Sequence, residues 1–129
     1  MTLKQLREHV MFQTNNDTDD LDEFQPAVDN YINEGYDRLV EVYADTHIGT
    51  TEFPVLSTIT DVPKIPSWAH RAIGDYATYL VYRNGNQYKQ NRGERYLQMF
   101  MDVLNKLRLY SVDENGVKKQ RHFYNLYTD

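Results

Sequence analysis

Apolar residues recur every three or four positions in four parts of the chain, which is the period of an α-helix with one buried face. The first helix is predicted from Thr2 to Phe12, with Thr2 as the N-cap, and the second from Leu21 to Tyr43. The segment from Pro66 to Leu107 holds the other two, separated by an Asn-Gly-Asn corner that favours a helix end and a new start. The pattern predicts an all-α fold, a small bundle of about four helices.

The hairpin from Pro66 to Leu107 is expected to form the core of this bundle, because apolar residues recur at helical spacing on both of its helices. Five large side chains on these stripes are predicted to anchor the core: Trp68, Ile73, Tyr76, Leu80 and Phe100. Gly35 lies inside the second predicted helix at a cost of roughly 1 kcal/mol relative to alanine. We interpret this glycine as a point of close helix packing.

Two segments do not follow the helical pattern. The segment from Ala44 to Ile65 contains Pro54, Pro63 and the β-branched run VLSTITDV, and we interpret it as an extended contact loop. Residues 110–129 contain an Asn-Gly turn between short β-capable runs, followed by an aromatic end, which predicts either a small hairpin or an arm. The expected organisation is a helical body at residues 1–109 and a C-terminal arm at residues 110–129.

The composition narrows the class of protein. A length of 129 residues, with 40% hydrophobic and 26% charged residues, fits one folded domain. No apolar run reaches the roughly 18 to 20 residues of a membrane span, and the start MTLKQLREHV lacks the apolar centre of a signal peptide. The chain has no cysteine, which excludes disulfides, thiolate nucleophiles and cysteine zinc sites. We therefore expect a soluble protein without a membrane contact.

Charge is unevenly distributed along the chain. The net charge of −5 argues against a free-standing nucleic-acid binder, because phosphate affinity comes largely from Lys and Arg. Met1 to Pro26 contains two basic and six acidic residues, whereas Arg83 to Arg108 contains six basic and two acidic residues. These two regions can attract each other, either within one subunit or between neighbouring copies.

Acidic residues gather before and at the start of the second predicted helix: Asp17, Asp19, Asp20, Asp22 and Glu23. Calcium loops also place oxygen ligands at alternate positions. If Asn15, Asp17 and Asp19 are aligned with the first three ligands, Asp20 falls where the loop requires Gly and Pro26 where it requires Glu, so the match fails. Helix capping and solvated charge are the favoured interpretation.

The chain carries no recognisable catalytic or cofactor-binding motif. The four histidines are His9, His47, His70 and His122, and they lack the spacing of a zinc site. Each is expected to be structural or exposed, and His70 is expected to have a packing or interface role. There is no Gly-x-Ser-x-Gly and no Gly-rich phosphate loop. We predict a protein that is not an enzyme and that binds neither a metal nor a cofactor.

Two groups of side chains are candidates for binding a macromolecule. The first is basic, with tyrosines nearby, and is interpreted as a solvated or intersubunit surface in preference to a DNA site: Lys89, Arg92, Arg95, Lys106 and Arg108, with Tyr88 and Tyr96. The second is the aromatic C-terminal group, expected to dock on a partner subunit, with folding back on its own body as the alternative: Tyr110, Phe123, Tyr124, Leu126 and Tyr127.

From Leu3 to Leu107 the chain resembles the head-to-tail connector (adaptor) proteins of tailed bacteriophages. The resemblance is carried by the order of the elements and by packing positions in the second helix and the hairpin: Asp20, Phe24, Tyr43, Pro66, Trp68, Ala69, Ala72, Ile73, Ala77, Tyr82, Arg83, Gly85 and Asn86. The loop at 44–65 and the aromatic tail depart from the pattern of that family.

The resemblance implies a structural virion protein of the neck region, assembled in the host cytoplasm. Neighbouring copies would form a twelve-fold ring between the portal protein and the tail or stopper protein. DNA would pass through the ring without sequence-specific binding. A small acidic helical interaction or regulatory module of bacterial origin is the alternative, and it would form a dimer in place of a ring.

Overall fold

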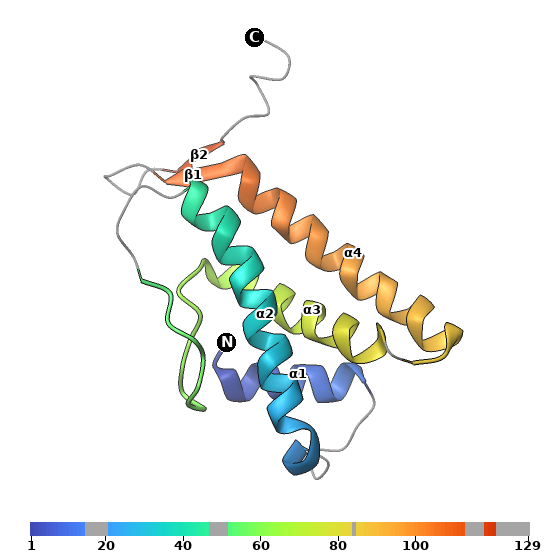
Figure 1. Ribbon diagram of the computed structural model, residues 1–129. Helices are drawn as coiled ribbons and strands as arrows, with labels where there is room; N and C mark the ends of the chain where they lie inside the picture. Colours follow the sequence, from blue (N-terminus) through green and yellow to red (C-terminus); the bar gives the residue numbers. More distant parts are fainter. Residues whose placement is uncertain (15–20, 47–51, 84, 113–117, 121–129) are drawn as a thin grey trace.

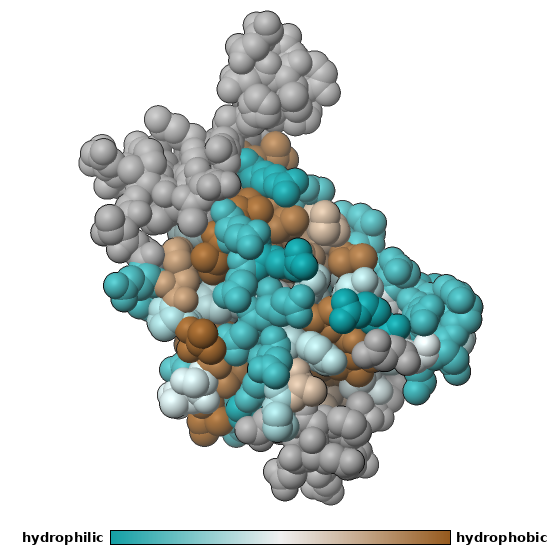
Figure 2. All heavy atoms as spheres, in the orientation of Figure 1, coloured by the Kyte–Doolittle hydropathy of each residue, from teal (hydrophilic) through white to brown (hydrophobic). Residues whose placement is uncertain are grey.

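The computed structural model describes residues 1–14, 21–46, 52–83, 85–112 and 118–120 (Figure 1). These residues contain four α-helices, α1 (Leu3–Gln13), α2 (Leu21–Thr46), α3 (His70–Arg83) and α4 (Gln87–Leu109), and the short 3₁₀ helix η2 (Ser67–Ala69). The predicted small all-α bundle is confirmed. Hydrophilic side chains cover much of the exposed surface of α2 and the free end of α4 (Figure 2).

α1 begins as the sequence predicts. The Thr2 side chain accepts a hydrogen bond from the Gln5 backbone N–H, and the Gln5 side chain accepts one from the Thr2 N–H, which forms a capping box. The apolar face of α1 is fully buried at Leu3, Leu6 and Val10. Since these positions are three and four residues apart, one face of the helix covers the core.

α2 crosses the whole bundle and continues to Thr46, three residues beyond the predicted end. The predicted loop therefore starts later than Ala44. Gly35 is a close-packing point, as predicted: a Cβ atom there would lie 3.1 Å from Tyr76 Cβ and 3.2 Å from the Ile73 carbonyl oxygen. The missing side chain lets α2 and α3 approach closely.

The hairpin of α3 and α4 supplies much of the core. Ile73, Tyr76, Leu80 and Phe100 are buried there, with the Tyr76 and Phe100 rings 4.6 Å apart between centroids. Trp68 is different, because it lies in η2 and is only partly buried at the edge of the core. Its ring is also covered by the Lys106 ammonium, 4.6 Å from the ring centroid.

The Asn-Gly-Asn corner lies between α3 and α4, as predicted. Asn86 caps α4 as predicted, since its side-chain oxygen accepts a hydrogen bond from the Lys89 N–H. The sequence predicts that Asn84 and Gly85 end α3; the backbone of Gly85 is not left-handed, and Asn84 lies outside the described residues. Gly93 lets α4 pack against α3, because a Cβ atom there would lie 2.9 Å from Tyr82 Cβ.

Two short strands follow α4. β1 (Tyr110–Val112) pairs antiparallel with β2 (Lys118–Gln120), with Tyr110 opposite Gln120 and Val112 opposite Lys118. Of the two alternatives predicted for this segment, the pairing is that of a hairpin. α2 and α4 both contact β1, and the two helices diverge from that end with α3 between them (Figure 1).

Candidate interaction surfaces

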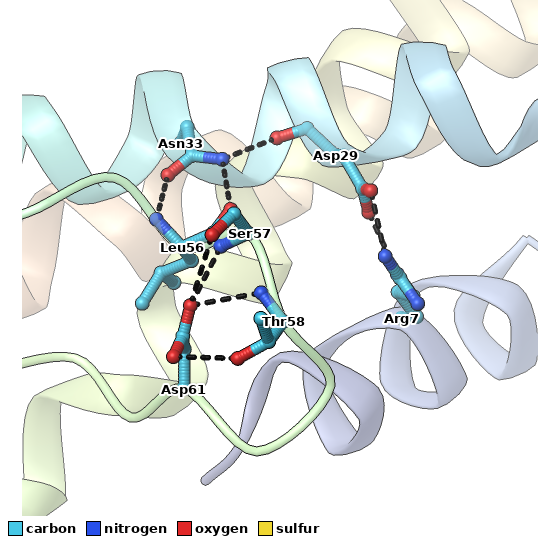
Figure 3. Close-up of polar contacts among 7 residues, drawn as sticks. All are labelled: Arg7, Asp29, Asn33, Leu56, Ser57, Thr58 and Asp61. Atoms are coloured by element: carbon cyan, nitrogen blue, oxygen red, sulfur yellow. Dashed lines mark hydrogen bonds and ion pairs between the residues drawn. The ribbon is translucent and has the colours of Figure 1, made fainter.

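The loop at residues 52–65 is held against α2 by side-chain clamps (Figure 3). The Asn33 amide donates to the Leu56 carbonyl at 3.0 Å and accepts from the Leu56 N–H at 2.8 Å. The buried Tyr36 hydroxyl accepts a hydrogen bond from the Lys64 N–H at 2.9 Å. The side chain of Leu56 is buried in the core. The segment that the sequence marks only as an extended loop therefore has a fixed position on the bundle.

Asp61 closes a tight turn within this loop (Figure 3). Its carboxylate accepts hydrogen bonds from the backbone N–H groups of Ser57 and Thr58, both at 2.8 Å, and from the Thr58 hydroxyl at 2.7 Å. The bonds from Thr58 and Ser57 stabilise the ionised form and lower the pKa of Asp61 to about 2. The turn thus depends on a charged Asp61.

The same turn also completes the start of α1. The Leu3 N–H donates to the Asp61 carbonyl at 2.8 Å, and the Lys4 N–H donates to the Ile59 carbonyl at 3.2 Å. The first backbone N–H groups of a helix have no partner within the helix, so the loop satisfies two donors that would otherwise need water. Loop and helix start therefore stabilise each other.

Three apolar side chains of this loop face solvent. Val55 is 67% exposed, Ile59 54% and Val62 49%, although the backbone between them is fixed by the bonds described above. We call these three residues the apolar tip; Figure 2 shows hydrophobic side chains at the edge of the molecule where the loop lies. Three exposed apolar side chains within eight residues of one fixed loop make this loop a candidate protein contact site.

A buried polar connection joins α1 to α3. Gln13 uses its whole amide here: its nitrogen donates to Asp75 at 2.9 Å, and its oxygen accepts from the Thr78 hydroxyl at 2.6 Å. The Gln13 carbonyl accepts from the Tyr82 hydroxyl at 3.0 Å, and the His9 ring nitrogen Nε2 lies 3.2 Å from Asp75. The Thr78 hydroxyl donates to the Gln13 side-chain oxygen and to the Gly74 carbonyl. It forms no hydrogen bond to His9, so His9 is not placed to act as a base that would activate this hydroxyl. The arrangement supports helix pairing and has no nucleophile and base in contact.

Sequence spacing could not reveal this connection. The sequence gives His9 no carboxylate at helical spacing, yet Asp75, 66 positions away, becomes its partner in the fold. The same holds for Arg7, which forms two 2.7 Å hydrogen bonds to Asp29 of α2. The hydrogen bonds that the buried Arg7 donates to the Asp29 carboxylate raise the pKa of Arg7. The only sequence signals were polar residues at 7, 9 and 13 on a helix that has a buried apolar face.

His70 has the packing role that its sequence position predicted. It is buried, its Nε2 lies 2.8 Å from the Ile65 carbonyl oxygen, and its Nδ1 lies 2.7 Å from the Met1 amine. Because a carbonyl can only accept, Nε2 carries the proton in this contact. Burial lowers the pKa of His70 and favours the neutral ring. His47 and His122 lie outside the described residues.

The acidic cluster is only partly described. Asp17, Asp19 and Asp20 lie outside the described residues, whereas the backbone of Asp22 and Glu23 belongs to the first turn of α2. Negative charge at that position is favourable to the helix dipole. Within the part of the chain that the structure describes, no three His, Asp or Glu side chains are placed to hold a metal ion.

The basic side chains of α4 form no single cluster: Arg92 and Arg95 line one pocket together with Tyr88 and Tyr96, whereas Lys106 and Arg108 lie at the far end of the helix. Arg92 lies over the Tyr82 ring at 6.0 Å and Lys106 over Trp68, so these two cover aromatic rings. Lys106 and Arg108 lie in the last turn of α4, where positive charge is favourable to the helix dipole. Tyr88 is exposed on the outer face of α4. The structure therefore does not bring the five basic residues into one compact site.

Most of the aromatic C-terminal group lies outside the described residues. Phe123, Tyr124, Leu126 and Tyr127 lie outside the described residues, and of Tyr110 only the backbone, in β1, is described.

None of the described helices is both long and apolar enough to cross a membrane. Comparisons of this chain with protein-family models, curated proteins and solved structures found no match.

Proposed function

We propose that this protein is a head-to-tail connector of a tailed bacteriophage, a structural subunit of a ring between the portal protein and the tail or stopper protein. The observation that carries the proposal is the apolar tip: Val55, Ile59 and Val62 are exposed on a loop that is fixed to both α1 and α2. A preordered apolar surface binds a protein partner with little further loss of conformational entropy. That property suits a subunit whose function is to hold other subunits.

The resemblance to the connector family supports the same proposal. Its residues in the hairpin include Ala69 of η2 and Ala72, Ile73 and Ala77 of α3, all of which are buried in the core of the bundle. These small and branched side chains allow α3 to lie close to its neighbours. In the proposed ring, DNA passes through the channel, and the net charge of −5 disfavours tight binding of its phosphates.

The proposal is tested by the size of the assembly and by its partner. Size-exclusion chromatography with light scattering should show large rings, either of the protein alone or after mixing with portal-bearing heads, and a reconstruction of the virion neck should place the chain directly against the portal. The heads without portal serve as the control and should bind no protein. A stable dimer that ignores portal-bearing heads would instead identify the small interaction module.

A further inference from the structure

A groove lies between α2, α3 and α4, on the side of α2 away from the loop. It has a volume of about 430 Å³ and an apolar lining from Tyr76, Tyr79, Leu97, Phe100 and Met101. This volume is large enough for a few side chains of a partner. Figure 2 shows hydrophobic side chains between the hydrophilic surfaces of α2 and α4.

The rim of the groove is positively charged. It carries Arg38, Arg83 and Arg108 but only one carboxylate, Glu41. Arg83 and Arg108 form no ion pair with any described residue, and the pair of Arg38 with Glu34 is long, at 3.9 Å, and exposed. Exposed pairs of this kind contribute little, so the positive charge of the rim is largely uncompensated. The groove therefore suits an apolar segment with acidic residues beside it.

The apolar tip has this chemistry. The described loop, residues 52–65, contains two acidic residues, Glu52 and Asp61, and one basic residue, Lys64, so its net charge is −1. Val55 and Ile59 are the most exposed apolar side chains of the loop, and each is held on a fixed backbone. The exposed apolar side chains and the sign of the loop's net charge complement the apolar lining and the positive rim of the groove.

The tip cannot enter the groove of its own subunit. Asn33, which holds the loop, and Val42, which lines the groove, are nine positions apart in α2. At about 100° per residue this separation places them on roughly opposite sides of the helix. The bonds of the loop to Asn33, Tyr36 and the start of α1 fix it on its own side.

We propose that the apolar tip of one copy binds in the groove between α2, α3 and α4 of the next copy. The contact joins two different surfaces, so each copy binds one neighbour through its tip and another through its groove. Repetition of such a contact forms a ring when the rotation closes. The inference rests on the proposed function in taking the occupant to be a second copy of this chain.

Two variants break the two halves of the contact separately. Val55→Ser with Ile59→Ser removes the apolar tip, and Arg83→Glu with Arg108→Glu reverses the charge of the groove rim. All four side chains are exposed, so the circular dichroism spectrum of both variants and the Tm of the tip variant should stay those of the parent. The groove variant should have a slightly lower Tm, because Arg83 and Arg108 lie in the last turns of α3 and α4, where negative charge opposes the helix dipole. Each variant alone should self-associate at least roughly tenfold more weakly than the parent. The tip variant loses apolar contact, and the groove variant places carboxylates opposite the acidic residues of the loop.

Mixing the two variants is the decisive experiment. The tip variant keeps an intact groove and the groove variant keeps an intact tip, so an equimolar mixture should form one-to-one dimers that do not grow. The control is Lys89→Glu with Arg95→Glu, a reversal of two exposed charges that do not line the groove, which should assemble like the parent. Undiminished assembly of either variant, absence of dimers in the mixture, or a parent that stays monomeric at roughly millimolar concentration would overturn the proposal.

The portal experiment separates this inference from the proposed function. Dimers in the mixture together with a parent that ignores portal-bearing heads would keep the contact and reject the connector function. A parent that forms rings on the portal, with both variants doing the same, would keep the function and reject the contact.

Discussion

Removal of the Asn33 side chain should release the loop at residues 52–65 and lower the stability of the whole domain. Asn33→Ala deletes both hydrogen bonds to the Leu56 backbone and the bond from Asn33 to the Asp29 carbonyl. A buried donor or acceptor left without a partner costs about 1 to 3 kcal/mol, and here water can reach the partly buried site. The lower end applies to each Leu56 group, which gives a loss of roughly 2 to 3 kcal/mol in the free energy of unfolding.

Thermal unfolding followed by circular dichroism measures this loss. For a domain of this size a change of 1 kcal/mol shifts Tm by roughly 3 to 6 °C, so Tm should fall by about 6 to 18 °C. Hydrogen exchange at the Leu56 amide should become faster, because its acceptor is gone. The matched control is Gln98→Ala, which removes an exposed amide bonded only to Asp102 of the next turn. If both variants melt together, the clamp has no energetic role and the loop is held by Leu56 alone.

Three further perturbations test other parts of the structure. Gly74→Ala should lower the free energy of unfolding, measured by chemical denaturation, by about 1 to 3 kcal/mol, because the new Cβ collides with the His9 ring. Adding His9→Ala should recover part of this loss, and fully additive effects of the two substitutions would contradict the collision. The pKa of Asp61 is lowered from 3.8 to about 2, so the turn should be intact above pH 4 and open as the pH falls toward 2; NMR of the Thr58 amide should report this, and an Asp61→Asn protein should show no such transition. Deletion of Phe123 to Asp129 should preserve the helical signal and reduce assembly on portal-bearing heads, whereas loss of helix would assign the tail to the core.

Local chemistry explains which parts of the fold were predictable. Thr2 and Asn86 cap their helices through contacts three residues along the chain, so the sequence contains both partners. The stripe of α3 and α4 identified Ile73, Leu80 and Phe100, all buried. Helical period shows which face of a helix is apolar, and that face is where the core forms.

The remaining contacts depend on residues that are distant in sequence. Asn33 and Leu56 are 23 positions apart, and His9 and Asp75 are 66 positions apart, so no motif spacing could join them. Trp68 shows a different limit, because an apolar pattern does not indicate whether an end position extends past the core. It lies in η2, ahead of α3, and remains partly exposed beneath Lys106.

The loop shows where fold and function can be separated. Its stability comes from the Asn33 clamp, the buried Leu56 and the Asp61 turn, together with the two N–H groups that it satisfies at the start of α1. None of these interactions uses the side chains of Val55, Ile59 or Val62, so polar residues at these positions would preserve the turn equally well. Scattered exposed apolar residues are normal on a monomer, but three on one fixed loop expose apolar surface that the isolated subunit does not bury. Burial of that surface by a neighbouring subunit would give these side chains the contact that their own fold leaves unmade.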